Sequence, residues 1–283
     1  MINSQIESVR RHLQKQYSGV LSEQQIDRHI HDYIGLSIAE QQVADVLAGG
    51  KVEQLLDIGC GFGSFVLAAR QKGIDAIGID IANFEIQFAR ERLHILRPQE
   101  NPENIYQLGT GISLPFSDEQ FDVVTLWNIL EHIPDDQVLL QEVSRILRPN
   151  GRVYIVCPNY AAFRSEAHYH LFWVPILPRS VAIEYLRFRG RNPSFFESNI
   201  FYRTNWGVIQ ALYRNGFELY PDDLLIFKLM NFDSTDKPAI TLILKIFKKL
   251  RLMGFVRMTL RFQLYNPFKH SVTLYAFKKE KKL

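Results

Sequence analysis

The chain has 283 residues, of which 47% are hydrophobic and 22% are charged. This balance is typical of a packed globular protein built around one large domain, and it excludes a disordered or collagen-like chain. Two cysteines are too few for a disulfide framework, so we expect a reducing compartment, the cytoplasm. The N-terminal residues carry no signal-peptide pattern, and no uncharged apolar run approaches the ~18 residues that span a bilayer. We therefore expect a soluble or peripheral protein.

The formal net charge of +3 is distributed unevenly along the chain. Residues 1–236 hold 21 basic and 29 acidic groups, whereas residues 237–283 hold 12 basic groups and 1 acidic group. An acidic body is thus joined to a strongly basic C-terminal segment. Such a segment favours an anionic partner.

Residues 1–50 are expected to form a helical cap that ends at Gly49-Gly50. From residue 51 to residue 160, short runs of Val, Ile and Leu alternate with helix-length segments. The expected strands cover residues 54–58, 76–80, 122–126 and 152–157, and the expected helices cover residues 64–72, 83–96 and 135–147. This alternation predicts an α/β fold with a doubly wound, Rossmann-like, mostly parallel sheet.

Two segments interrupt the alternation, and we interpret both as insertions on the acceptor side of the domain. The first covers about residues 161–206 and is rich in aromatic and basic residues, and the second covers about residues 224–269. Between and after them, strands are expected at 217–220 and 273–277. We therefore expect a single domain over residues 51–283 in addition to the helical cap.

A glycine-rich motif follows the first expected strand and precedes the first expected helix of the domain. Residues 57–63 are Asp-Ile-Gly-Cys-Gly-Phe-Gly. Glycines at such a turn let backbone N–H groups approach a ligand, and the N-terminus of the next helix adds partial positive charge. The third glycine, Gly63, comes one residue earlier than in the G-x-G-x-x-G pattern of dinucleotide-binding folds, which disfavours a nicotinamide-dependent oxidoreductase.

The motif resembles the first motif of class I S-adenosylmethionine-dependent methyltransferases, Asp-hydrophobic-Gly-x-Gly-x-Gly. The resemblance continues through blocks that begin at Gly78, Ser113, Phe121, Leu130 and Leu147. Their order and spacing over residues 51–160 are similar to the branch that includes ubiquinone-type methyltransferases. The resemblance implies S-adenosylmethionine as the cofactor.

The resemblance and the chemistry of the cofactor together assign roles to residues. Asp57 and the three glycines suit the amino-acid end, and Asp80 suits the ribose hydroxyls, with a helix N-cap as its alternative role. Ile81 is expected on the adenine ring. The candidate cofactor-binding residues are Asp57, Gly59, Cys60, Gly61, Gly63, Asp80, Ile81, Thr110, Gly111, Ile112, Trp127 and Asn128.

Two of these candidates have features of their own. Thr110 stands where the family commonly has an aspartate that contacts the adenine amino group; a hydroxyl can still form that hydrogen bond. Trp127 and Asn128 follow the fourth expected strand, and we expect them beside the reactive methyl group.

Glu131, His132 and His170 are the candidate catalytic residues. An imidazole suits proton transfer at neutral pH, but His132 can equally be a hydrogen-bonded structural residue, and both interpretations stay open. His168 and His170 open the first insertion, where they either serve the acceptor site or belong to an aromatic lid. Some relatives bind a divalent metal through Glu-x-x-Glu-His; here the first glutamate is replaced by Asn128, so we expect no metal.

The insertions bear on the acceptor. Arg187, Arg189 and Arg191 suit an anionic acceptor, or else form a solvated basic loop. In the second insertion, residues 240–250 form an amphipathic pattern that either packs on the domain or docks, with the rest of residues 237–283, on an anionic membrane. Nucleic acid is disfavoured as a partner, because the sequence contains no recognised binding module.

These observations predict methyl transfer from S-adenosylmethionine, at an oxygen atom, to a small or lipid- or glycan-linked acceptor. The alternatives are a protein that binds the cofactor without catalysis and, less favoured, the oxidoreductase.

Overall fold

The computed structural model describes residues 2–162, 164–173, 177–219 and 252–279. The expected helical segment at the N-terminus consists of α1 (Ile2–Gln16), α2 (Glu23–Ile34) and α3 (Leu36–Leu47). The backbone N–H of Ser22 donates to Oε1 of Gln25 at 2.7 Å, which fixes the beginning of α2.

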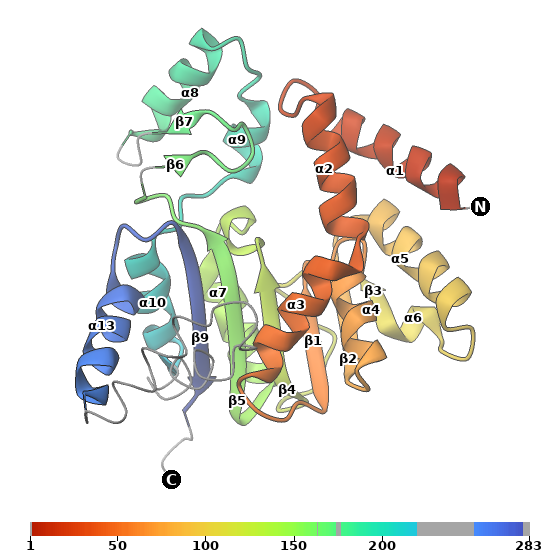
Figure 1. Cartoon of the computed structure of the whole chain (residues 1–283), viewed down its shortest axis with the longest axis vertical. Coiled ribbons are helices and arrows are strands. Elements are labelled where there is room, and N and C mark those ends of the chain that lie inside the picture. Colours follow the sequence, from red (N-terminus) through yellow and green to blue (C-terminus); the bar gives the residue numbers. More distant parts are fainter. Residues whose placement is uncertain (1, 163, 174–176, 220–251, 280–283) are drawn as a thin grey trace.

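The strands form a seven-stranded sheet in the order β3-β2-β1-β4-β5-β9-β8, and Figure 1 shows all of these strands except β8 with labels. They are β1 (Gln54–Ile58), β2 (Asp75–Asp80), β3 (Tyr106–Leu108), β4 (Phe121–Trp127), β5 (Leu147–Pro158), β8 (Phe217–Leu219) and β9 (Ser271–Lys278). Strands β1 to β5 pair in parallel, and β9 runs antiparallel to both of its neighbours. The predicted doubly wound, mostly parallel sheet is confirmed.

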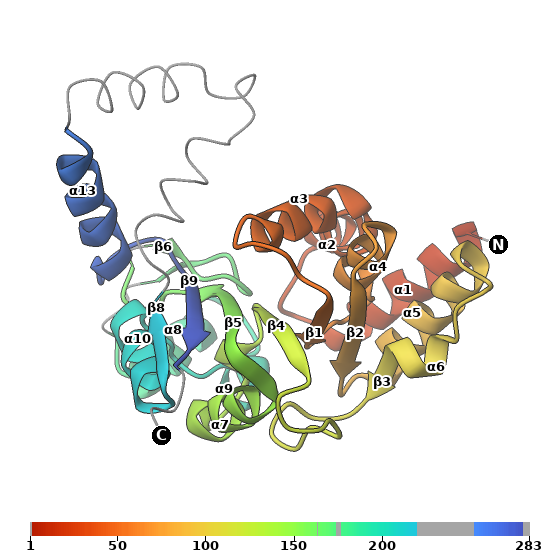
Figure 2. The same cartoon turned by 90° about the horizontal axis from the view of Figure 1, so that it is seen from below.

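Helices cover both faces of the sheet. One face carries α3, α4 (Ser64–Gln71) and α5 (Asn83–Leu96), and the other carries α7 (Asp136–Ile146) and α10 (Asn205–Arg214). Figure 2 shows α3 and α4 on the side opposite to α7. Adjacent residues of β1 point to opposite faces of the sheet. Leu55 packs in the apolar cluster beneath α3 and α4, Leu56 packs in the cluster beneath α7 and α10, and both side chains are fully buried.

The structure differs from the sequence prediction at two strands. The three residues of β3 were not expected, because so short a strand after the brief helix α6 (Pro102–Ile105) has no periodicity of its own. Strand β5 already begins at Leu147, before the predicted turn, and its pairing with β4 shifts register near Phe121.

The first insertion contains a two-stranded antiparallel sheet formed by β6 (Arg164–Ser165) and β7 (Phe172–Trp173). Two helices follow it, α8 (Arg179–Phe188) and α9 (Ser194–Asn199). Figure 1 shows these elements at the same end of the sheet as α1 and α2. The two parts share an apolar cluster, in which Val20 of the N-terminal segment joins residues of the insertion. This end of the sheet is where the carboxyl ends of the parallel strands lie.

The second insertion is described only in part. Helix α13 (Met253–Tyr265) belongs to it, whereas the amphipathic pattern at 240–250 lies outside the described residues. Within the part of the chain that the structure describes, no helix is both long and apolar enough to cross a membrane.

Candidate active site

A glycine-rich turn connects β1 to α4. Gly59, Gly61 and Gly63 adopt positive φ angles of 76°, 50° and 74°, which favour glycine. A Cβ atom at Gly59 would lie 2.3 Å from the side chain of Ile129, and one at Gly63 would lie 2.6 Å from the ring of Tyr106. Close packing therefore fixes the shape of the turn, directly before the N-terminus of α4.

The carboxylate of Asp80 lies at the end of β2 and is held by the backbone. Its Oδ2 accepts a hydrogen bond from the N–H of Gly61 at 2.8 Å, and its Oδ1 accepts one from the N–H of Ala82 at 2.8 Å. The N-cap position of α5 is Ala82, so Asp80 is not the N-cap residue. A carboxylate has about four acceptor positions, and two remain for a ligand such as a ribose diol.

Three large apolar side chains are exposed at or after the ends of β2 and β3. Ile81, Leu108 and Ile112 are 74%, 54% and 49% exposed. In the register of β2 and β3, Leu108 lies directly opposite Asp80. An aromatic base would cover this surface, as the prediction for Ile81 requires. Leu108 was not among the candidates, because β3 was not recognised from the sequence.

The loop after β3 contains the candidates Thr110 and Gly111. Thr110 is exposed, and its hydroxyl group can reach solvent or a ligand. Gly111 is buried, and a Cβ atom there would lie 2.9 Å from the side chains of Ile58 and Leu139. Gly111 therefore brings the loop close to the end of β1.

Asp57 and Cys60 are buried beside the turn. Burial raises the pKa of Asp57 to about 8, even though its Oδ1 accepts a hydrogen bond from the hydroxyl of Thr125 at 2.7 Å. Burial also raises the pKa of the Cys60 thiol, whose Sγ packs on Gly78. The side chain of Cys60 therefore points into the protein, and only the backbone of Cys60 is available to a ligand.

Trp127 and Asn128 end β4. The indole of Trp127 lies 5.4 Å from the ring of Phe65 and 4.8 Å from that of Tyr154, measured between centroids. Its Nε1 is buried and has no hydrogen-bond partner among the residues that the structure describes. Asn128 is exposed, with a φ of 53°. A non-glycine residue held in this conformation at a strand end is typical of a functional loop.

The short 3₁₀ helix η1 (Leu130–His132) follows, and it carries two catalytic candidates. The side chain of Glu131 is buried, and the residue is 1% exposed. Nδ1 of His132 lies 2.7 Å from the backbone oxygen of Asn199, and the backbone oxygen of Glu131 accepts a hydrogen bond from the N–H of Phe201 at 2.7 Å. The end of α9 and the residues directly after it thus hold both residues in place.

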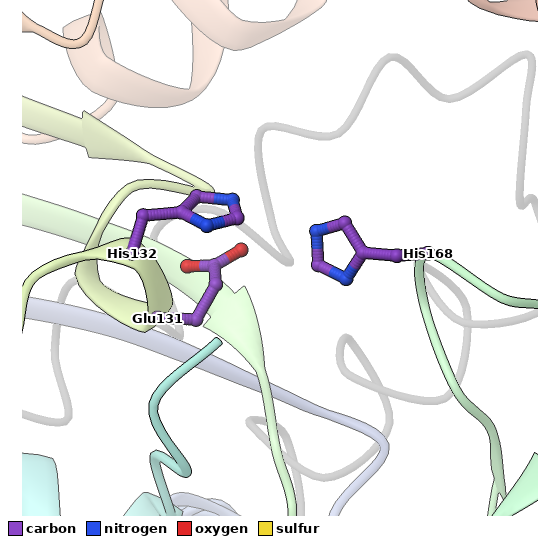
Figure 3. Close-up of side chains that lie close together, drawn as sticks. All are labelled: Glu131, His132 and His168. Carbon is purple, nitrogen blue, oxygen red and sulfur yellow. The ribbon is translucent and has the colours of Figure 1, made fainter. Parts of the chain in front are cut away.

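His168 and Glu166 face η1 from the first insertion. The rings of His132 and His168 are 5.2 Å apart, and Figure 3 shows them turned toward each other beside Glu131. Nδ1 of His168 lies 3.0 Å from Oε1 of Glu166, which also accepts the hydroxyl of Tyr160 at 2.8 Å. Burial alone would raise the pKa of Glu166. Hydrogen bonds from His168, Tyr169 and Tyr160 outweigh the effect of burial and lower this pKa to about 2. Glu166 is therefore an ionised carboxylate that orients His168.

The structure brings His168, and not the candidate His170, to Glu131 and His132. His170 is exposed at the end of the turn, where its N–H donates to the backbone oxygen of Glu166 at 2.9 Å. Burial lowers the pKa of His29 in α2 to about 4. The ring of His29 lies 5.5 Å from that of Tyr17, which in turn lies 5.4 Å from the ring of Phe195 in the first insertion. Burial likewise lowers the pKa of His132 to about 4. Both rings are neutral at pH 7.

Sequence reasoning missed Glu166 and His29. The Glu166-x-His168 spacing was the one available signal for Glu166, because a carboxylate two residues from a histidine can orient its ring. For His29 there was no signal, because only the fold brings α2 near the insertion.

The predicted arginine cluster has partners of its own. Arg187 pairs with Glu184 at 2.5 Å, and Arg189 donates to a tyrosine hydroxyl of the same helix at 3.2 Å. Arg191 donates to the backbone oxygen of Val20 at 3.4 Å. These contacts favour the interpretation of a solvated basic segment over that of an anion site.

The strand order, the glycine-rich turn and the acidic residue at the tip of β2 together define a Rossmann-like enzyme fold with a site for a nucleoside cofactor. Comparison with known proteins gives the class. Residues 56–155 match the family described as "Methyltransferase domain". Residues 56–155 are therefore similar to a methyltransferase domain, in agreement with the resemblance of the sequence motifs.

Known relatives match less than half of the chain. A ubiquinone biosynthesis O-methyltransferase from Pasteurella multocida is 35% identical over 44% of this chain and 52% of its own length. A 27-O-demethylrifamycin SV methyltransferase from Amycolatopsis mediterranei is 28% identical over 47% of this chain and 51% of its own length. The chain thus spans about half the length of these relatives.

A solved structure extends the likeness in fold. It is an S-adenosylmethionine-dependent methyltransferase from Mesorhizobium loti, with a TM-score of 0.52 and 19% identity. The match covers 86% of this chain and 100% of that one, so the shared fold reaches beyond the methyltransferase domain.

Proposed function

We propose that the protein transfers a methyl group from S-adenosylmethionine to an oxygen atom of a small or lipid- or glycan-linked acceptor. One observation carries the proposal: the cofactor turn adjoins the segment that bears the histidines. The side chain of Ile129 packs directly on Gly59, and His132 follows three residues later. An acceptor held between the histidines and the turn would lie beside the end of the cofactor.

The residues of the turn fit S-adenosylmethionine. Asp80 keeps acceptor positions for the ribose hydroxyls, and the exposed apolar side chains at or after the ends of β2 and β3 offer a surface for adenine. Asp57 and the N–H groups of the turn would hold the amino-acid end. When bound, the sulfonium group supplies the methyl that is transferred.

The histidines support oxygen as the accepting atom. Nδ1 of His132 faces a carbonyl and Nδ1 of His168 faces a carboxylate, so Nδ1 carries a proton in both rings, and in the neutral form of the ring Nε2 keeps its lone pair. An Nε2 of this kind can accept the hydrogen bond of an acceptor hydroxyl and take its proton. The names of both relatives also refer to oxygen.

Aromatic rings surround the histidines and suit an acceptor with an apolar part. Phe195 lies 5.5 Å from the ring of His168 and 5.4 Å from that of Tyr17. On α2, Tyr33 lies 4.5 Å from His29. We propose that the acceptor presents a hydroxyl group on an aromatic or aliphatic body.

Titration with S-adenosylhomocysteine tests the cofactor site. We expect saturable binding by the wild type and a weakening of about 10- to 100-fold in Asp80→Asn, which loses the charge but keeps an acceptor. Asp75→Asn, at the opposite end of the same strand, is the matched control and should bind like the wild type. A wild-type protein that does not bind S-adenosylhomocysteine refutes the proposal.

The accepting atom is tested by incubation with matched hydroxyl and amine compounds, followed by mass measurement of the products. We expect methylated hydroxyl products, formed more slowly by His132→Gln. Methylation of amines alone would contradict transfer to oxygen, and cofactor binding without any product would favour the non-catalytic alternative.

We further propose that residues 237–283 dock on an anionic lipid surface. Helix α13 supports this, because Phe255, Met258 and Phe262 are large apolar side chains exposed on it. They accompany the concentration of basic residues in the same part of the chain.

A further inference from the structure

Three potential metal ligands meet beyond the end of β4. Glu131 and His132 lie in η1, and His168 comes from the turn between β6 and β7. One potential ligand atom of each lies within 4.8 Å of the other two, and Figure 3 shows the carboxylate between the two rings. We propose that Glu131, His132 and His168 bind one divalent transition-metal cation of the zinc or manganese class.

Hydrogen bonds orient both histidines as ligands. The backbone oxygen of Asn199, 2.7 Å from Nδ1 of His132, can only accept, so Nδ1 carries the proton. Oε1 of Glu166 lies 3.0 Å from Nδ1 of His168 and is the corresponding acceptor for the second ring. Metal-ligating histidines characteristically donate their other N–H to a carbonyl or carboxylate in this way. Nε2 is then the ligating atom of both rings.

The charges around the cluster match a divalent cation. Glu131 is buried, and Glu166 lies behind His168 with all of its side chain inaccessible to solvent. Burying carboxylates is costly unless a positive charge accompanies them. A divalent cation beside Glu131 would add positive charge at a place where two carboxyl side chains are buried.

The ligand types select among cations. Two imidazoles and one carboxylate suit zinc, manganese, cobalt or iron, whereas magnesium and calcium prefer oxygen ligands alone. In a tetrahedral site two ligand atoms that each lie about 2.1 Å from the metal are about 3.4 Å apart, so atoms at the 4.8 Å limit would draw together by about 1.4 Å when the cation binds. Three protein ligands leave coordination positions open, as in catalytic zinc sites.

The fold supplies a ligand that the sequence did not reveal. The expectation of no metal rested on Asn128 in place of a glutamate. His168 takes up the third position from a different element, 36 residues after His132. If the proposed function holds, a bound cation would replace the histidines as the group that activates the acceptor, because an acceptor hydroxyl in an open coordination position would lose its proton to solvent more readily; the metal site itself does not depend on that function.

Calorimetric titration of the untagged protein with Zn²⁺ and with Mn²⁺ tests the site. We expect the wild type to bind one cation per chain. The affinity for the cation should fall by about 10- to 100-fold in His132→Gln and in His168→Gln. His170→Asn is the matched control: it removes a histidine of the same turn, and asparagine tolerates the φ of 53° at this position. It should bind like the wild type. Wild-type protein that binds neither cation, or variants that bind as tightly as the wild type, would overturn the site.

A second measurement does not depend on the variants folding. X-ray absorption at the zinc edge of the loaded wild type should show two imidazole ligands, and a spectrum without imidazole scattering refutes the assignment. Titration of the same samples with S-adenosylhomocysteine separates the two proposals, because its failure bears on the methyltransferase function and leaves the metal result standing.

Discussion

Asp57 is the residue whose ionisation should be coupled to the cofactor. Its buried carboxyl group has a pKa of about 8, so it is largely protonated at neutral pH. The ammonium group of the cofactor favours the carboxylate, and binding below pH 8 should therefore release a proton. We predict that affinity for S-adenosylhomocysteine rises by up to about tenfold per unit between pH 6 and pH 8. Calorimetry in buffers of different ionisation enthalpy measures the released proton.

The variant Asp57→Asn is the control for this coupling. It should bind more weakly at pH 8 and show no rise with pH. A wild-type affinity that is independent of pH would contradict the coupling.

The same residue should make the unliganded protein less stable at high pH. In the unfolded chain the carboxyl group ionises near 3.8, and in the folded protein it ionises near 8. Between these values the folded state binds more protons, so stability falls as the pH rises. We predict that Asp57→Asn is more stable than the wild type at pH 8, by on the order of a few kcal/mol, and gains less at pH 5. Urea unfolding at both pH values measures this, and equal gains would count against it.

At the scale of elements, one hydroxyl group joins the helical cap to the cofactor turn. Oγ of Ser64, the first residue of α4, donates to the backbone oxygen of Tyr33 at 2.6 Å and accepts from Nη1 of Arg92 at 2.8 Å. Helices α2, α4 and α5 thus meet at Ser64. We predict that Ser64→Ala lowers the free energy of unfolding by about 1–2 kcal/mol, since it removes two part-buried hydrogen bonds. Denaturant unfolding measures the loss.

The control for this link is Ser113→Ala, which removes an exposed hydroxyl from a loop. It should change stability by less than about 0.5 kcal/mol. Equal losses in the two variants would show that the hydroxyl of Ser64 does not hold the helices together.

The elements also show what could be predicted from the sequence. Between residues 54 and 96, the predicted ends of the strands and helices agree with the observed ends to within one residue. The spacing of apolar residues and the glycines that end helices are local signals, which the sequence alone contains. Asp80 was correctly placed at the tip of β2 for the same reason. The pairing of His168 with His132 could not be foreseen, because it depends on how the insertion folds back over β4. Glu166 orients His168 through the same fold.

At the scale of the whole molecule, charge and exposed apolar surface coincide in the C-terminal part. The body up to residue 236 has an excess of acidic groups, whereas residues 237–283 hold 12 basic groups and 1 acidic group. In the same part, Phe255 and Phe262 on α13 are exposed. Basic residues near an anionic surface contribute about 1 kcal/mol each, and buried aromatic side chains add the apolar part of the binding energy.

This coincidence predicts binding to anionic vesicles that depends on both contributions. The wild type should sediment with vesicles rich in phosphatidylserine, not with neutral ones, and salt should release it because salt screens the charges. Phe255→Ser with Phe262→Ser should reduce the bound fraction several-fold, since each lost ring removes on the order of 1 kcal/mol or more of apolar burial. The control is Phe188→Ser, which removes an exposed ring from α8 in the first insertion and should leave binding unchanged. If anionic and neutral vesicles retain the protein equally poorly, the C-terminal segment does not dock on lipid, and the exposed face of α13 has another partner.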